Sequence, residues 1–98
     1  ALLSSVVWAP IMEETIHRGM LYRYLRDHLR WPLAVLVSAA LFAVMHRSLA
    51  AFPCHFISGV TFALLREWRG SLLAPVAAHA TINLAAGLAT IDRIAWLL

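Results

Sequence analysis

The sequence predicts an all-α fold, a polytopic transmembrane bundle of about four helices that forms a single domain over residues 1–98. The chain is 62% hydrophobic and only 13% charged, and its mean hydropathy is +0.78. Soluble domains carry about 45–50% apolar and about 25% charged residues. Four apolar stretches are separated by short breaks, and each proline lies near an expected helix start. Because the first residue is not Met and the first residues resemble the end of a helix, we expect the core of a larger membrane protein.

The charges indicate a membrane topology. The net charge is +3, from eight arginines and no lysine against five acids. The arginines cluster at the ends of apolar runs, which fits a lipid bilayer as partner better than nucleic acid, so no nucleic-acid binding is expected. The single cysteine, Cys54, allows no internal disulfide and no cysteine metal cluster. No signal peptide pattern is visible.

The first helix is expected over about residues 10–26. Pro10 either starts this helix or kinks a longer one, so residues 1–9 belong to the same kinked span or end a preceding helix. If the helix starts at Pro10, Glu13 and Glu14 lie in its first turn, where the helix dipole favours negative charge. The stretch 22–31 mixes aromatic side chains with arginines and is typical of a membrane interface.

Three further helices are expected over residues 32–46, 53–68 and about 71–91, the last closed by Asp92 and Arg93. The first of these three is shorter than the about 20 residues of a full span, which fits a helix that is buried or reaches part way. The arginine-rich segments around residues 23–30 and 66–69 fall on one side of the predicted bundle. The positive-inside rule places this side in the cytoplasm, as expected for a multi-pass protein of a bacterial-type plasma membrane.

The chain is organised around residues 12–19, which hold two adjacent carboxylates and an arginine. An ionisable group at bilayer depth costs roughly 2.5–3.5 kcal/mol on insertion scales. Three such groups within six residues therefore indicate a functional or structural role. Glu14 and Arg18 are four positions apart and are expected to form a salt bridge. Glu13 points about 100° away from Glu14. A buried carboxylate without a firm cation partner suits a general base or acid, although a pair with His17, four positions on, is the alternative.

Three polar residues on other helices are candidate partners of Glu13. His46 ends the second helix, while His79 and Asn83 are four positions apart and share one face of an apolar helix. At about 1.5 Å of rise per residue, all four residues reach overlapping depths. We therefore expect one buried site in which the charge of Glu13 stays unmatched until His46 comes near. The alternatives are a helix cap for His46 and an interhelical hydrogen bond for His79 and Asn83, worth about 0.6 kcal/mol.

Other residues are weaker candidates. Cys54 and His55 are neighbours in sequence, so their side chains point apart on a helix and no Cys–His dyad is expected. His28 falls in the arginine-rich segment and is expected to be solvated. Gly59 and Gly87 are expected to allow close contact between helices.

Three spaced motifs resemble those of a known family. They are Glu13-Glu14-x-x-x-Arg18, Phe42-x-x-x-His46 and His79-x-x-x-Asn83. In this order, on three hydrophobic segments, they are similar to the signature of the CPBP family, the CAAX prenyl protease and bacteriocin-processing (ABI) intramembrane endopeptidases. The resemblance extends from Pro10 to about Gly87. His17 departs from the apolar or aromatic residue that is common before the arginine, and the second helix is short.

The resemblance implies a helical membrane protease with a site open toward the cytosol. It implies that Glu13 and His46 activate water, and that His79 and Asn83 form an oxyanion hole. Glu14, Arg18 and Phe42 are then supporting residues. The implied reaction is hydrolysis of a peptide bond near the membrane, with no serine or cysteine nucleophile. The substrate is a peptide or lipidated protein, and prenylated C-termini, leader peptides and other membrane-proximal peptides all stay open.

Two alternatives remain. The same protease could depend on Zn²⁺ held by Glu13, His46 and His79, which are suitable ligand types. The sequence lacks HExxH, so no motif requires a metal, and we expect no cofactor. In the other alternative, the chain is a non-proteolytic immunity or assembly module whose polar residues serve packing.

Overall fold

The computed structural model describes residues 2–97, and every regular element in this range is helical. The first helical segment is continuous from residue 2 to residue 28 and consists of η1 (Ser4–Trp8), α1 (Ala9–Glu14), η2 (Thr15–Leu21) and α2 (Tyr22–His28), where η marks π-helical turns. It is followed by α3 (Trp31–Met45), α4 (Phe52–Arg69) and α5 (Leu73–Leu97). The predicted all-α class is confirmed for these residues.

Pro10 does not start the first helix but lies inside a longer one. The π-helical turn η1 precedes it, with the Ala9 N–H donating to the carbonyl of Ser4, five residues earlier. Of the two alternatives for Pro10, the longer span is the one found: residues 2–28 form one continuous helical segment, so Glu13 and Glu14 do not lie in a first helical turn. A second π-helical segment, η2, follows the two carboxylates directly. Such segments are rare and are frequent at functional sites.

The bounds of α3 and α4 agree with the predicted helices within one residue, whereas α5 is longer than expected. The chain stays helical through Asp92 and Arg93. No glycine or proline follows Gly87, so nothing in the backbone chemistry stops the helix there. By contrast, α4 ends where Gly70 adopts a left-handed conformation (φ 67°), as helix C-termini commonly do.

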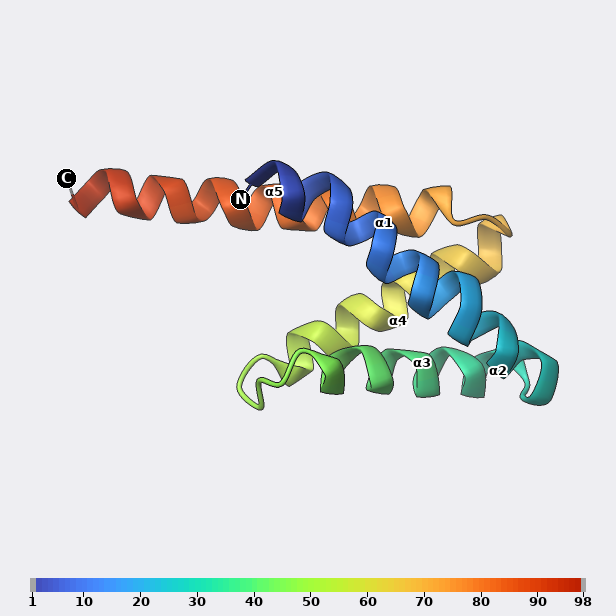
Figure 1. The fold of residues 1–98 in the computed structure, drawn as a ribbon. Coiled ribbons are helices and arrows are strands. Elements are labelled where there is room, and N and C mark those ends of the chain that lie inside the picture. Colours follow the sequence, from blue (N-terminus) through green and yellow to red (C-terminus); the bar gives the residue numbers. More distant parts are fainter. Residues whose placement is uncertain (1, 98) are drawn as a thin grey trace.

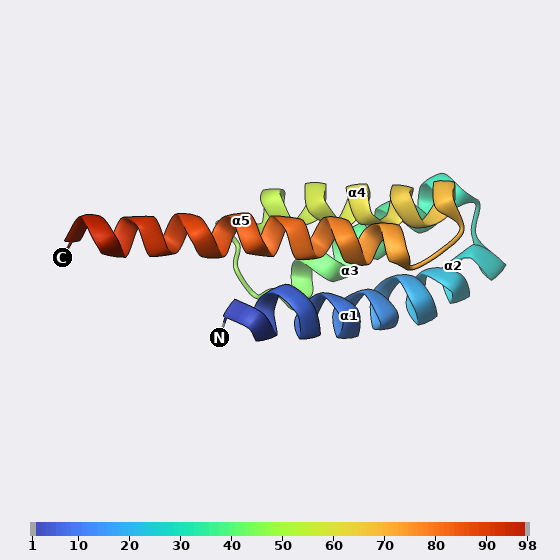
Figure 2. The same ribbon diagram turned by 90° about the horizontal axis from the view of Figure 1, so that it is seen from above.

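The helices enclose a small interior beside α4. This helix packs against both α3 and α5, and the first segment packs along α5 and reaches α3. The C-terminal half of α5 projects beyond the other helices (Figures 1 and 2). Gly59 allows the closest approach of α3 and α4, since a Cβ there would lie 3.0 Å from Ala39 Cα. The expected role of both glycines is confirmed, because a Cβ on Gly87 would overlap the side chain of Leu2.

A polar cluster ties α2 to α4 at the arginine-rich end of the molecule. Glu67 accepts hydrogen bonds from the Tyr22 hydroxyl (2.6 Å) and from Arg26 Nε (2.9 Å). The hydrogen bond from Tyr22 is the main cause that holds the pKa of Glu67 below its ordinary value of 4.5, with help from Arg26. His28 is exposed, as expected, although it lies in α2 rather than in a loop.

The surface carries many large apolar side chains, and the interior includes charged ones. Large apolar side chains such as Leu3, Trp8 and Leu73 are more than half exposed, whereas Glu14 and Arg18 are fully buried. Soluble proteins almost never bury such charges while exposing so many large apolar groups. Within the described range, residues 73–93 of α5 are long and apolar enough to cross a membrane, and α3 is a shorter apolar helix.

Candidate active site

The expected salt bridge between Glu14 and Arg18 is confirmed and anchors the site. Arg18 Nη1 donates to Glu14 Oε2 (3.1 Å), and both side chains have no exposed surface. Arg18 Nη2 donates to the carbonyl of Gly59 on α4 (2.8 Å). The guanidinium carbon also lies 4.6 Å from the centre of the Phe42 ring and 5.4 Å from that of Phe62. One arginine therefore neutralises Glu14 and links the first segment to α3 and α4.

His79 bridges the two adjacent carboxylates. Its Nε2 lies 3.2 Å from Glu13 Oε2, and its Nδ1 lies 3.0 Å from Glu14 Oε2. The imidazole of α5 thus contacts both carboxylates of the first segment, one through each ring nitrogen. The side chain of Glu13 is 38% exposed while that of Glu14 is fully buried. The two neighbouring carboxylates thus differ in access to solvent, and Glu13 is the accessible one.

The expected partner of Glu13 is wrong. The charge of Glu13 is matched by His79, and neither His46 nor His17 is its partner in the structure. His17 is buried and presents its ring to Phe42, with centroids 5.4 Å apart and planes nearly perpendicular. Glu13 and His17 are four positions apart, as on adjacent turns of a helix. The imidazole that contacts Glu13 is nevertheless that of His79, which belongs to α5.

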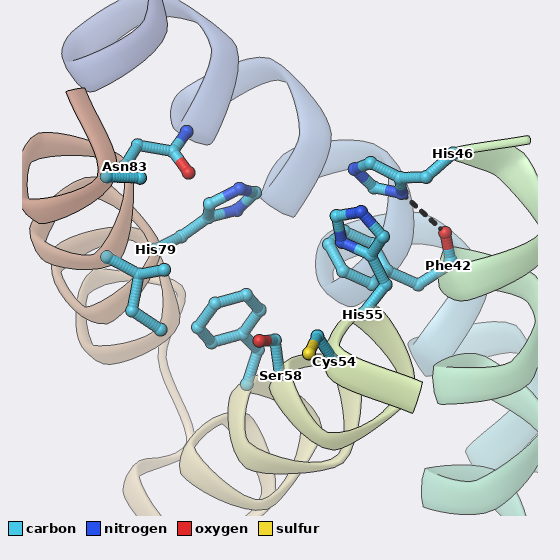
Figure 3. A pocket seen from close by; sticks show the side chains of 10 residues that line it. Phe42, His46, Cys54, His55, Ser58, His79 and Asn83 are labelled. Atoms are coloured by element: carbon cyan, nitrogen blue, oxygen red, sulfur yellow. Dashed lines mark hydrogen bonds between the residues drawn. The ribbon is translucent and has the colours of Figure 1, made fainter. Parts of the chain in front are cut away.

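His46 takes the C-cap position of α3 and also faces the pocket of the site. Its Nδ1 lies 2.8 Å from the carbonyl oxygen of Phe42, so this nitrogen carries the proton and donates. Nε2 is then left as an acceptor. Figure 3 shows that nitrogen turned away from the hydrogen bond and toward the side of the pocket on which His79 and Asn83 lie.

Asn83 follows His79 by one helical turn on α5 and forms the interhelical hydrogen bond that was the alternative interpretation. Its Nδ2 donates to the carbonyl of Ser5 in η1 (2.8 Å). The amide carries a second N–H that this bond does not use. Asn83 is therefore fixed by the first segment and keeps one donor for another partner.

A pocket of about 220 Å³ brings most of the expected residues together (Figure 3). His46, His79 and Asn83 line it together with Phe42, and Glu13 adjoins it through His79. Three helices, α3, α4 and α5, contribute to its walls. The convergence of His46, His79 and Asn83 is what the sequence predicted, while the contact partners inside the cluster differ.

The sequence interpretation missed the contribution of α4 to this pocket. His55 and Ser58 line it, and so does Cys54. Cys54 is an exposed free cysteine that lines the pocket beside its sequence neighbour His55. The signal for His55 was its spacing. It lies four positions before Gly59, on the helix face that packs inward.

The three residues expected as an alternative zinc set do not gather. Glu13 and His79 are in contact, but His46 is bound to Phe42 instead. In the part of the chain that the structure describes, no group of three or more His, Cys, Asp or Glu side chains is arranged to hold a metal ion. A zinc site built from these residues would need His46 to move.

Together, the fold and the site define a helical protein with many exposed apolar side chains and a polar centre inside it. Residues 1–85 match the family of type II CAAX prenyl endopeptidases described as Rce1-like, and the chain belongs to this family of membrane peptidases. The resemblance seen in the three motifs is thus confirmed.

One curated relative supports the same family. The chain is 30% identical over 82 residues to the protein named "Putative membrane peptidase YdiL" from Bacillus subtilis (strain 168). The aligned part is 84% of this chain and 33% of that protein, so the chain spans about a third of the relative's length. No solved structure matches the chain.

Proposed function

We propose that this chain carries the active site of an intramembrane endopeptidase. Its helices would form a transmembrane bundle, with the arginine-rich segments in the cytoplasm. The site would hydrolyse a peptide bond near the membrane in a membrane-associated substrate, such as a prenylated protein or one with a leader or C-terminal signal. The observation that carries the proposal is the Glu13–His79 contact. It places a partly exposed carboxylate beside a pocket, inside a protein whose outer surface is apolar.

In this proposal Glu13 and His46 activate a water molecule. Glu13 takes a proton from water, and the free Nε2 of His46 accepts a hydrogen bond from the same water and orients it. The oxygen attacks the carbonyl carbon, the carbonyl becomes an oxyanion, and the C–N bond breaks when the proton passes to the leaving nitrogen. The buried Glu14–Arg18 pair keeps the segment that carries Glu13 in place.

His79 and Asn83 would stabilise the oxyanion. Both line the pocket, and each can offer an N–H, from the imidazole and from the unused amide hydrogen. In the structure His79 Nε2 lies 3.2 Å from Glu13 Oε2, within reach of a hydrogen bond when this nitrogen carries a proton. When Glu13 becomes protonated, that N–H loses its anionic partner and is free to turn to the oxyanion. Loss of one such donor typically costs about 10²–10³ in rate.

The test is cleavage of a fluorescent farnesylated peptide ending in a CAAX sequence by the purified chain in detergent. Replacing Glu13 by Gln should lower kcat by about 10²–10⁴, because general acid–base catalysis supplies that much. Asp27→Asn is the matched control, since Asp27 is an exposed acid on the same helical segment. Wild-type turnover by the Glu13 variant would refute the assignment of the base.

The natural substrate is identified by comparing protein termini in cells that contain the wild-type chain or Glu13→Ala. Substrates should shorten only with the wild type. If no terminus differs while both proteins insert in the membrane, the non-proteolytic alternative gains over the protease.

A further inference from the structure

Two imidazoles stack face to face in the pocket, although only one belongs to the three motifs. The rings of His46 and His55 have centroids 4.0 Å apart and planes inclined by 21°. Aromatic pairs are more often seen at about 4.5–7 Å, so this contact is close. It joins the end of α3 to the first turn of α4.

His46 lies at the very end of its helix, so its ring is held by few contacts within α3. It occupies the C-cap of α3, where its N–H lies 3.3 Å from the carbonyl of Ala43. The next residue, Arg47, has a left-handed conformation (φ 53°), which is uncommon for a side chain other than glycine. Two contacts hold the His46 ring within α3, and both come from Phe42. His55 is the ring that fixes it relative to another helix.

α4 also supports His79, another imidazole of the pocket, by ring stacking. Phe62 lies seven residues after His55, two helical turns along the same face. Its ring stacks on His79 with centroids 4.8 Å apart and planes inclined by 16°. Gly59, between them, accepts the hydrogen bond from Arg18 and packs on Ala39. One face of α4 therefore meets both imidazoles and the arginine of the site.

We propose that His55 is a positioning residue, which holds the imidazole of His46 by stacking so that Nε2 faces the pocket. The role needs a flat ring at position 55, not a titratable one. Its kinetic consequence rests on the proposed peptidase function, whereas the stacking itself does not. The half-buried position of His55 makes it a better place for a test than Phe62, which is 1% exposed.

The first experiment observes His46 without any substrate. The chain has five histidines, so a sample labelled at histidine ¹³Cε1 and held in detergent micelles gives five signals, and His46→Gln identifies the one from residue 46. His55→Ala should shift and broaden this signal, because the ring current and the restraint are lost. His55→Phe should keep it narrow. Ile57→Ala, an exposed change on the same helix, is the matched control and should leave it unchanged. An identical His46 signal in wild type and His55→Ala would overturn the proposal.

The second experiment measures kinetics on the farnesylated CAAX peptide. His55→Ala should lower kcat by about ten- to a hundredfold with KM little changed, since a misplacement of about 1 Å can cost 10² in rate. His55→Phe should recover most of the loss. Equal kcat loss in both variants would overturn the stacking role. If the wild type cleaves nothing, the proposed function fails on that substrate, and the histidine signals still decide the role of His55.

Discussion

Removal of Arg18 should destabilise the protein strongly, because it leaves a buried carboxylate without its main cation. Arg18→Met keeps the length and apolar volume of the stem but deletes the ion pair with Glu14 and the hydrogen bond to the carbonyl of Gly59. Breaking a buried ion pair by removing one partner typically costs about 3–5 kcal/mol. The lost hydrogen bond from the charged guanidinium to the Gly59 carbonyl accounts for about 1.5–3 kcal/mol of such a loss.

The lower end of that range, about 3 kcal/mol, is expected here. His79 Nδ1 lies 3.0 Å from Glu14 Oε2 and leaves this carboxylate with one polar partner when Arg18 is replaced. The matched control is Arg23→Met, since Arg23 is an exposed arginine on the same helical segment. A surface change of this kind usually stays within about 0.5 kcal/mol. The free energy of unfolding is measured by chemical denaturation in detergent micelles, followed by circular dichroism.

A double variant separates the charge from the hydrogen bond. Glu14→Gln with Arg18→Met removes both charges and should recover about 1–3 kcal/mol of the loss, within the usual range of coupling between contacting residues. If Arg18→Met is as stable as Arg23→Met, the argument from buried charge is refuted. If the double variant is as unstable as the single one, the lost stability comes from the missing hydrogen bond to the Gly59 carbonyl.

Three more predictions follow from single contacts. Gly59→Ala should cost about 1–3 kcal/mol and lower kcat, because its Cβ meets the Ala39 backbone; Gly87→Ala, which meets only a flexible leucine side chain, should cost less in the same denaturation assay. Tyr22→Phe should destabilise the protein at pH 7 by removing the bond that lowers the pKa of Glu67; this contribution is present above pH 4.5 and is lost as the pH falls through the lowered pKa, so the two denaturation curves should converge in acid. A persistent difference well below pH 4 would contradict that origin. Exhaustive chelation should leave cleavage of the farnesylated peptide unchanged, with no metal detected by elemental analysis; loss of activity that Zn²⁺ restores would favour the metal-dependent alternative.

Several features could be predicted from the sequence because they depend on local chemistry. Spacing of four positions was enough for the Glu14–Arg18 pair, since the helix alone brings the two side chains together. Apolar runs bounded by prolines and arginines predicted α3 and α4 within one residue. The end of α5 was missed, because charged residues at an interface do not by themselves stop a helix.

The partners inside the site could not be predicted in the same way. On sequence grounds Glu13 was expected to pair with His46 or, as the alternative, with His17, while His79 was expected in the same site as an oxyanion donor; the structure pairs Glu13 with His79. Which imidazole contacts Glu13 depends on how α5 is rotated against the first segment. The spacing of residues within one helix does not determine this rotation. For the same reason the stacking of His55 on His46 could not be predicted, although the spacing of His55 from Gly59 places it on the inward face of its helix.

Four properties could be predicted without the structure: the chain is helical, it exposes apolar surface, Arg18 neutralises Glu14, and its motifs indicate the family to which it belongs. The helices and the ion pair depend on residues a few positions apart. Composition and motifs can be recognised without knowing how the helices pack. Two properties depend on the tertiary structure. His79 contacts both Glu13 and Glu14, and α4 stacks aromatic rings on His46 and His79. Such contacts join residues far apart in the chain, and their geometry is set by how closely the helices pack, here at Gly59 against Ala39.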